Sequence, residues 1–211
     1  DAAVFEGQLA LQKTYADLRG DRIAEINVQI GDLLSFFGAL CHLDSGRRRY
    51  TLELLNMVQR ACYHVEFMVK HLCRAARPVD LSGSVQPIIQ TPSHSSYPNG
   101  HACEAFAIAT VLIPLRYPGM TLVDAMNTTM EFRLAERIAA NRIVAGVHFP
   151  VDTIAGAALG VAIGRGILSL AGSRQVRPTI PKLGAGFGGT TDFSLKEVVA
   201  AAGSMAPGAE R

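Results

Sequence analysis

The stretch Asn141-Arg142-Ile143-Val144-Ala145-Gly146-Val147-His148-Phe149-Pro150-Val151-Asp152 brings a guanidinium, an imidazole and a carboxylate close together in the chain. Its glycine ends one apolar helical run and Pro150 opens the next, which is typical of a junction between two helices. A carboxylate is favoured in the first helical turn, so Asp152 is expected to accept a hydrogen bond from one ring nitrogen of His148. The other nitrogen would keep a lone pair that can attack phosphorus or bind a metal centre. A second interpretation stays open, in which His148 is only a satisfied polar group.

Apolar residues recur at helical spacing on both sides of this junction, and proline or glycine bounds most of the runs. The predicted helices are 3–18, 21–43, 51–77, 102–113, 126–145 and 150–172. They predict an all-α fold, with a single helical bundle over residues 1–172 as the catalytic domain. Residues 173–211 are rich in Gly, Pro, Ser and Thr and are expected to form a C-terminal tail or arm, with one short amphipathic helix at 193–202.

Charge and hydropathy argue against a nucleic-acid-binding protein and against a membrane-spanning one. The net charge of the 211 residues is only +2 and the basic residues are spread out, so no nucleic-acid partner is expected. No apolar run reaches the roughly 18 uncharged residues that a membrane-spanning helix needs. The nearest, 153–172, is broken by Arg165, and we interpret it as a closely packed interior helix. The sequence therefore predicts a soluble protein without a membrane span, and a homo-oligomer is left open.

Two further stretches carry polar groups suited to an anion. Lys70, Arg74 and Arg77 stand at i, i+4 and i+7 near the end of a predicted helix, where they form either a solvated edge or a cationic cluster. The segment 78–100 then runs without regular structure up to His101, which is long for a compact domain unless the loop is functional.

The end of that loop predicts an anion-binding helix start. Asn99 is a good N-cap residue, and Gly100 lets the backbone approach a ligand closely. Free N–H groups at such a position attract oxyanions, and His101 is placed to exchange a proton there. With planar guanidinium groups and several cations, the three stretches form a set of residues suited to a tetrahedral or trigonal-bipyramidal oxyanion.

The order and spacing of these residues resemble the three-part signature of the type 2 phosphatidic acid phosphatase and vanadium haloperoxidase superfamily. The resemblance covers about residues 50–165, and the sequence that flanks the signature is most similar to that of soluble bacterial haloperoxidase-like members. It implies a helical bundle of the acid phosphatase and vanadium haloperoxidase type, in a bacterial cytoplasm or periplasm. The matching residues are Lys70, Arg77 and Pro78, then Pro98, Gly100 and His101, then Arg142, Gly146, His148 and Asp152.

The resemblance also implies a role for each of these side chains. Lys70, Arg77 and Arg142 would hold the equatorial oxygens, with Gly100 donating its N–H. His101 would be the acid–base group, and His148 would be the vanadium ligand or the phosphoryl nucleophile, oriented by Asp152. The family usually has serine where Asn99 and Asn141 stand. Asn99 can still donate through its amide, although its greater length changes the shape of the pocket.

Two reactions and one non-catalytic function remain open. The favoured hypothesis is a haloperoxidase that binds vanadate, for which phosphate competes, and oxidises bromide with hydrogen peroxide. It is motivated by His94, because the bromide-oxidising type has a histidine at this position on the pocket rim and the chloride-oxidising type has an aromatic residue. The alternative is a phosphatase that cleaves a phosphate ester through a phosphohistidine. The third possibility is a helical module that binds oxyanions without turnover.

Overall fold

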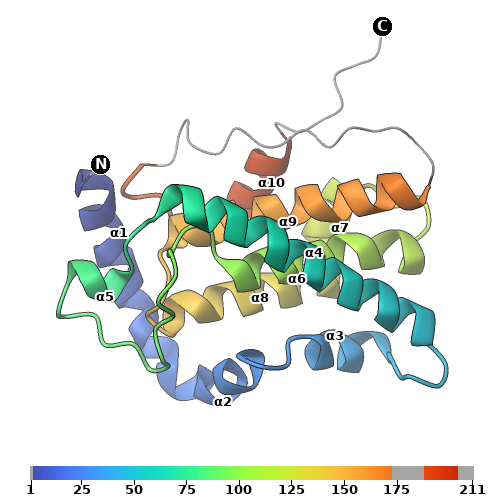
Figure 1. The fold of residues 1–211 in the computed structure, drawn as a ribbon, viewed down its shortest axis with the longest axis horizontal. Helices are drawn as coiled ribbons and strands as arrows, with labels where there is room; N and C mark the ends of the chain where they lie inside the picture. Colours follow the sequence, from blue (N-terminus) through green and yellow to red (C-terminus); the bar gives the residue numbers. More distant parts are fainter. Residues whose placement is uncertain (1, 173–187, 204–211) are drawn as a thin grey trace, which may run out of the picture.

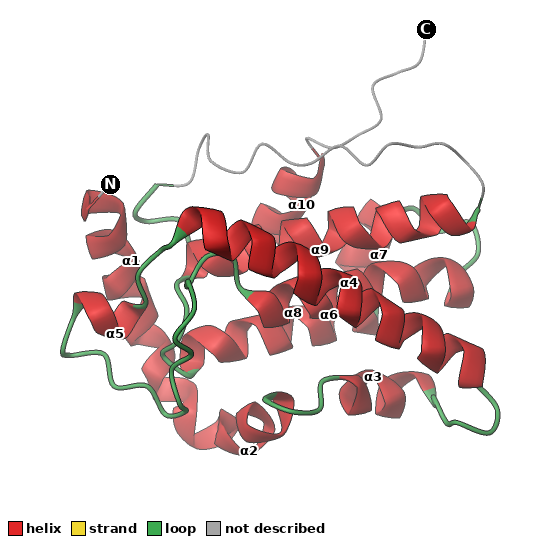
Figure 2. Ribbon diagram, viewed as in Figure 1, coloured by secondary structure: helices red, strands yellow, loops and turns green. Residues whose placement is uncertain are grey.

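The computed structural model describes residues 2–172 and 188–203, and this part of the chain is helical without a strand (Figure 2). The predicted all-α fold is confirmed. The long helices are α1 (Ala2–Thr14), α2 (Arg19–Gln29), α4 (Arg49–Cys73), α6 (Gly100–Arg116), α8 (Met130–Val144) and α9 (Pro150–Ala171). The shorter ones are η1 (Tyr15–Leu18), α3 (Leu34–Cys41), α5 (Pro78–Leu81), α7 (Leu122–Thr128) and α10 (Leu195–Gly203).

Helices α6 and α9 form the centre of the bundle and are packed almost backbone to backbone. Three glycines of α9 at i, i+4 and i+8 face α6. A Cβ at Gly156 would overlap the backbone carbonyl of the N-cap Asn99, and a Cβ at Gly160 would overlap that of Cys103 within α6. A Cβ at Gly164 would lie 2.8 Å from Thr110 Cβ. The contacts advance along both helices in the same direction, so α6 and α9 are parallel and their N-termini lie side by side. The backbone N–H of Asn99 donates to the Asp152 carbonyl at 2.9 Å and joins the two starts.

The remaining long helices surround this pair (Figure 1). Helix α8 packs against α6 and α9, and α4 crosses over both of them. Aromatic and branched side chains such as Phe37, Phe106 and Phe132 are fully buried between them. At about 25 cal/mol per Å² of buried apolar surface, this core is the main source of stability.

The N-terminal region differs from the single predicted helix at 21–43. Helix α2 ends at Gln29 and α3 begins at Leu34. The chain bends by 98° between the segments Val4–Gln29 and Leu34–Cys41. The side chain of Asp32, one residue before the N-cap Leu33, accepts the Ser35 N–H at 3.0 Å and satisfies a donor in the first turn of α3. The bend turns Phe37 into the core and leaves Ile30 exposed.

Three other predicted boundaries are corrected. Helix α4 ends at Cys73, before Arg77, because Arg74 adopts the left-handed conformation at φ 47°. Helix α6 continues past Pro114 to Arg116. The region 126–145 is divided at Thr129 between α7 and α8. Thr121 is the N-cap of α7, and its hydroxyl accepts the Asp124 N–H at 3.1 Å.

The described part of the predicted tail contains a helix, as expected for 193–202. Helix α10 packs on α9, and Phe193, Leu195 and Val198 are buried in the main core. Residues 173–187 and 204–211 of the predicted tail lie outside the described residues.

One helix contradicts the expectation from hydropathy. Helix α9 is long and apolar enough to cross a membrane, with a mean hydropathy of 1.7 in its most apolar window, of which 56% is buried inside the protein. The segments Val4–Gln29 and Leu34–Cys41 pass the same test only as a bent pair. The prediction that no segment is suited to span a membrane is therefore wrong: Arg165 interrupts the uncharged run, but it does not lower the hydropathy of the helix enough.

Candidate active site

Four segments that are distant in sequence meet at one end of the α6–α9 pair. They are the C-terminal end of α4, the loop after it, the start of α6 and the junction between α8 and α9. Positive φ at Gly146 (83°) turns the chain at the junction, so α9 can begin beside α6. The Ile88 N–H donates to the Ala145 carbonyl at 3.0 Å and ties the loop to the junction.

His148 and Asp152 are arranged as the sequence predicted. The Nδ1 atom of His148 lies 3.3 Å from Asp152 Oδ2, which also accepts the Phe149 N–H at 2.9 Å. The hydroxyl of buried Ser96 donates to the same oxygen at 2.5 Å. Three groups therefore converge on one carboxylate oxygen, which fixes the plane of the imidazole.

Arg77 determines which nitrogen of His148 carries the hydrogen. Its Nη1 lies 3.1 Å from His148 Nε2 and also donates to the Val147 carbonyl at 2.7 Å. A guanidinium only donates, so Nε2 must be the acceptor and Nδ1 must hold the hydrogen that points to Asp152. Burial lowers the pKa of His148 well below its usual value, and the cations of Arg77 and Lys70 lower it further. His148 is therefore neutral, with a bare lone pair on Nε2.

The guanidinium of Arg77 is itself held by backbone carbonyls. Its Nε donates to the His94 carbonyl at 3.1 Å and Nη2 donates to the Ser95 carbonyl at 3.2 Å. Nη2 also lies 3.2 Å from His94 Nδ1. These contacts place His94 beside the pocket, as the sequence predicted for a rim residue.

Lys70 is buried on the α4 side of the site. Its ammonium group donates to the Ser95 carbonyl at 3.2 Å and to the Pro98 carbonyl. Glu66, one turn earlier on α4, is also buried, and its Oε2 has no hydrogen-bond partner. A Cβ at Gly100 would overlap this carboxyl group, so any larger residue at the start of α6 would require the Glu66 side chain to move.

Asn99 caps α6, and its amide is engaged with the protein. Its Oδ1 accepts the Ala102 N–H at 3.3 Å and its Nδ2 donates to Thr153 Oγ1 at 3.1 Å. The oxyanion contact expected of Asn99 stays a prediction that would require one of these bonds to be exchanged. Asn141 likewise donates to Gln29 Oε1 at 3.1 Å.

Gln29 joins two other predicted site residues. Its backbone carbonyl accepts from His101 Nε2 at 2.9 Å, and its side-chain oxygen accepts from Arg142 Nη2 at 3.0 Å. The Arg142 Nε is buried without a partner. Burial lowers the pKa of His101 to about 3, and the cation of Arg142 adds to this effect. Gln29 itself, Glu66 and Ser96 were not assigned a role from the sequence, and no local sequence pattern indicated the partners of Gln29.

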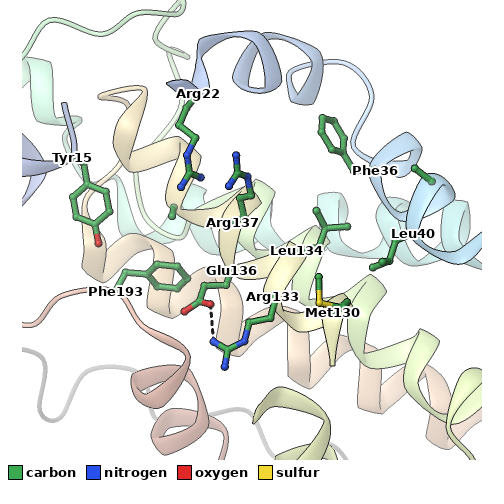
Figure 3. Close-up of a pocket in the computed structure, with 12 residues that line it drawn as sticks. Tyr15, Arg22, Phe36, Leu40, Met130, Arg133, Leu134, Glu136, Arg137 and Phe193 are labelled. Carbon is green, nitrogen blue, oxygen red and sulfur yellow. Dashed lines mark hydrogen bonds and ion pairs between the residues drawn. The ribbon is translucent and has the colours of Figure 1, made fainter. Parts of the chain in front are cut away.

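A different cavity, of about 700 Å³, lies between α2, α3 and α8 (Figure 3). Figure 3 shows Arg133 paired with Glu136, at 3.3 Å. Arg137 and Arg22 share the carboxylate of Glu25, at 2.8 and 3.6 Å. Because these cations are neutralised, this cavity is a weaker oxyanion site than the cluster around His148.

The Asp152→Asn variant is expected to bind phosphate about 10- to 100-fold more weakly, since loss of a carboxylate that orients a histidine has effects of this size. Titration calorimetry would measure the affinity, and Asp124→Asn at the start of α7 serves as a matched control. Equal affinities in wild type and Asp152→Asn would reduce Asp152 to an ordinary carboxylate at a helix N-terminus.

Anion binding is expected to weaken as the pH rises through about 8. Burial lowers the pKa of Lys70 to about 8, so its cation is present below this pH and is lost above it. Affinity for sulfate, which stays a dianion, should fall by up to about tenfold per pH unit above pH 8. Lys70→Met should bind sulfate more weakly at pH 7, and its affinity should no longer fall above pH 8. An equal fall in affinity in both proteins would show that another group loses its charge there.

Comparison with known proteins identifies relatives of this chain. The family model "PAP2 superfamily" matches residues 51–175. A decaprenylphosphoryl-5-phosphoribose phosphatase of Mycobacterium tuberculosis is 33% identical over 143 residues, covering 68% of this chain and 72% of that protein. A vanadium-dependent bromoperoxidase of Ascophyllum nodosum is 34% identical over 94 residues, but the match covers 35% of this chain and 17% of the relative.

Two solved structures share the fold. A transmembrane PAP2-type phosphatidylglycerolphosphate phosphatase of Bacillus subtilis superposes with a TM-score of 0.61 at 18% identity, covering 82% of this chain and 88% of that one. Aquifex aeolicus LpxE superposes with a TM-score of 0.57 at 27% identity, covering 76% and 94%.

These findings correct the predictions of a soluble protein and of a chain without a membrane span. One similar structure is described as transmembrane, and α9 has the length and hydropathy of a spanning helix. The phosphatase matches are also longer than the bromoperoxidase match, so they favour the phosphatase alternative over the haloperoxidase hypothesis. By its family match and by its similarity to the mycobacterial phosphatase, the chain belongs to the PAP2 superfamily.

Proposed function

We propose that this protein is a phosphatase that cleaves a phosphomonoester through a phosphohistidine on His148. The observation that carries the proposal is the contact between Arg77 Nη1 and His148 Nε2 at 3.1 Å. It leaves Nε2 as an unprotonated lone pair, beside a guanidinium that can transfer its hydrogen bond to a phosphoryl oxygen. The matches to named phosphatases support the same reaction.

The first step would form the bond between His148 Nε2 and phosphorus while the bond to the leaving oxygen breaks. The leaving oxygen takes a proton from the imidazolium of His101. Although burial lowers the pKa of His101, a phosphate dianion nearby favours its protonated form. Lys70, Arg77 and Arg142 offset the charge that the phosphoryl oxygens carry in the transition state.

The second step would release the phosphate. Neutral His101 removes a proton from water, the water oxygen bonds to phosphorus, and the bond to Nε2 breaks. The bond from His148 Nδ1 to Asp152 keeps the ring in place through both steps. The protein thereby returns to its initial protonation state.

A haloperoxidase is the second candidate, and two observations favour it. These are the partial match to a bromoperoxidase and the position of His94, 3.2 Å from Arg77 Nη2. The residues present fit vanadate, because the neutral imidazole of His148 lies beside the buried cation of Arg77, which shares the Ser95 carbonyl with the buried ammonium of Lys70. His148 Nε2 would bind the vanadium and Lys70, Arg77 and Arg142 would hold its oxygens. Vanadate, when bound, would supply the activation of hydrogen peroxide.

One pair of assays separates these functions. Purified protein should release phosphate from p-nitrophenyl phosphate, and orthovanadate should inhibit the reaction because it has the shape of the transition state. Bromination by hydrogen peroxide after vanadate loading, without ester hydrolysis, would support the haloperoxidase. Phosphate binding without either reaction would overturn both and indicate the non-catalytic module.

A further inference from the structure

A second cavity, of about 710 Å³, adjoins the candidate active site. It lies between the C-terminal end of α4 and the loop residues 91–95, and it shares Lys70, Arg77 and His94 with the site. A volume of this size is in the range of pockets that enclose whole small molecules, roughly 300–1,000 Å³. We call it the outer pocket. It offers room for the part of a substrate that lies beyond the phosphoryl group.

The outer pocket contains more cations than one phosphoryl group requires. Besides the shared residues, His71 and Arg74 line it, while Thr91 and Ser93 supply hydroxyl groups from the loop. Asp80 is the one acidic side chain in its described lining, and its Oδ2 already accepts the Arg77 N–H at 2.8 Å. The charge of this wall is therefore strongly positive.

Arg74 has a backbone conformation that other residue types adopt more easily. It is the C-cap of α4 with φ 47°, a conformation for which glycine and asparagine are preferred. Its Nε donates to the His71 carbonyl at 3.3 Å, and it forms no ion pair with any residue that the structure describes. The structure thus places an exposed guanidinium at the edge of the outer pocket without a carboxylate to neutralise it.

From this arrangement we infer that the preferred substrates are phosphomonoesters whose alcohol part carries a second anionic group, bound by Arg74 in the outer pocket. This inference rests on the proposed phosphatase function and adds a substrate class to it. Lys70 and Arg77 would contact the phosphoryl group that is cleaved, and Arg74, with His71, would contact the second group. A planar guanidinium suits phosphate or carboxylate oxygens equally well in geometry.

The test compares propyl phosphate with propane-1,3-diyl bisphosphate, which differ only in the second phosphate. Wild-type protein is expected to bind the bisphosphate about 10- to 100-fold more tightly, which is the usual effect of one hydrogen-bonded charge pair on affinity. Arg74→Asn keeps a residue that tolerates positive φ and should lose most of this preference. Its affinity for propyl phosphate should stay within about threefold of wild type, since one guanidinium at the rim contributes little there.

Arg60→Gln is the matched control, because it removes the same charge from an exposed position earlier on α4. It should retain the preference for the bisphosphate. Equal affinity of wild type for both compounds, or an equal loss in both arginine variants, would overturn the inference. Hydrolysis of both esters at equal efficiency would also overturn the inference about Arg74, but it would leave the phosphatase proposal intact. Binding of the bisphosphate that depends on Arg74 without any hydrolysis would support the outer pocket and reject the phosphatase.

Discussion

Hydrolysis of p-nitrophenyl phosphate by the His148→Ala variant is expected to fall by roughly 10⁴-fold or more, the scale seen when a catalytic nucleophile is removed. The variant loses the lone pair that forms the covalent intermediate, whereas Arg77 and Lys70 remain to bind the anion. Phosphate affinity should therefore change much less than turnover. This difference separates a nucleophile from a residue that only binds.

A covalent intermediate gives this prediction a second measurement. Rapid quenching of wild-type protein with a ³²P-labelled substrate should trap label that is stable in alkali and lost in acid, as expected of a phosphoramidate. His148→Ala should trap none, and His64→Ala, at an exposed position on α4, should trap as much as wild type. Equal labelling of His148→Ala and wild type would show that another residue is the nucleophile.

The second large effect is expected at the contact between α6 and α9. Gly160→Ala should lower the free energy of unfolding by about 3 kcal/mol, near the upper end for overpacking, because the new methyl group would overlap the Cys103 carbonyl. The obstacle is backbone, so no side chain can turn away to relieve it. Denaturant unfolding would measure the loss, which is a large fraction of the ~5–15 kcal/mol typical of a whole domain.

Gly20→Ala is the control for this substitution. Gly20 is helical, and apart from its chain neighbours and the backbone of its own helix no atom lies within 4 Å of its ideal Cβ, so alanine should raise the stability by about 0.5–1 kcal/mol. Opposite signs at the two positions would show that packing, and not helix propensity, requires glycine in α9. A neutral Gly160→Ala would mean that the helices can separate without cost.

The local features of the site were predictable from sequence because they depend on short spacings. His148 and Asp152 are i and i+4 across a helix start, and Asn99 caps the helix that follows it, so both geometries follow from local rules. The apolar periodicity likewise predicted the long helices. Their exact ends were less predictable, as Pro114 shows, since it is accommodated inside the last turns of α6.

Long-range contacts were not predictable in the same way. Gln29 reaches His101 and Arg142 from a distant helix, and nothing in its neighbourhood in sequence indicates those partners. Arg74 and Arg77 were grouped on one helical face, but the left-handed residue at 74 ends the helix and sends Arg77 inward. A single residue with positive φ can therefore bury one of two neighbouring cations and leave the other exposed, even though both line the outer pocket.

The parallel arrangement of α6 and α9 has an electrostatic cost for the protein itself. Two macrodipoles side by side in the same direction repel each other, each with a charge equivalent of about +0.5 at its N-terminus. Buried Lys70, Arg77 and Arg142 add to the repulsion at the same end. A bound anion offsets it, and by linkage a ligand at 100 times its Kd contributes about 2.7 kcal/mol to the stability of the folded state. The substrate is in this sense also a counterion that helps to hold the two central helices together.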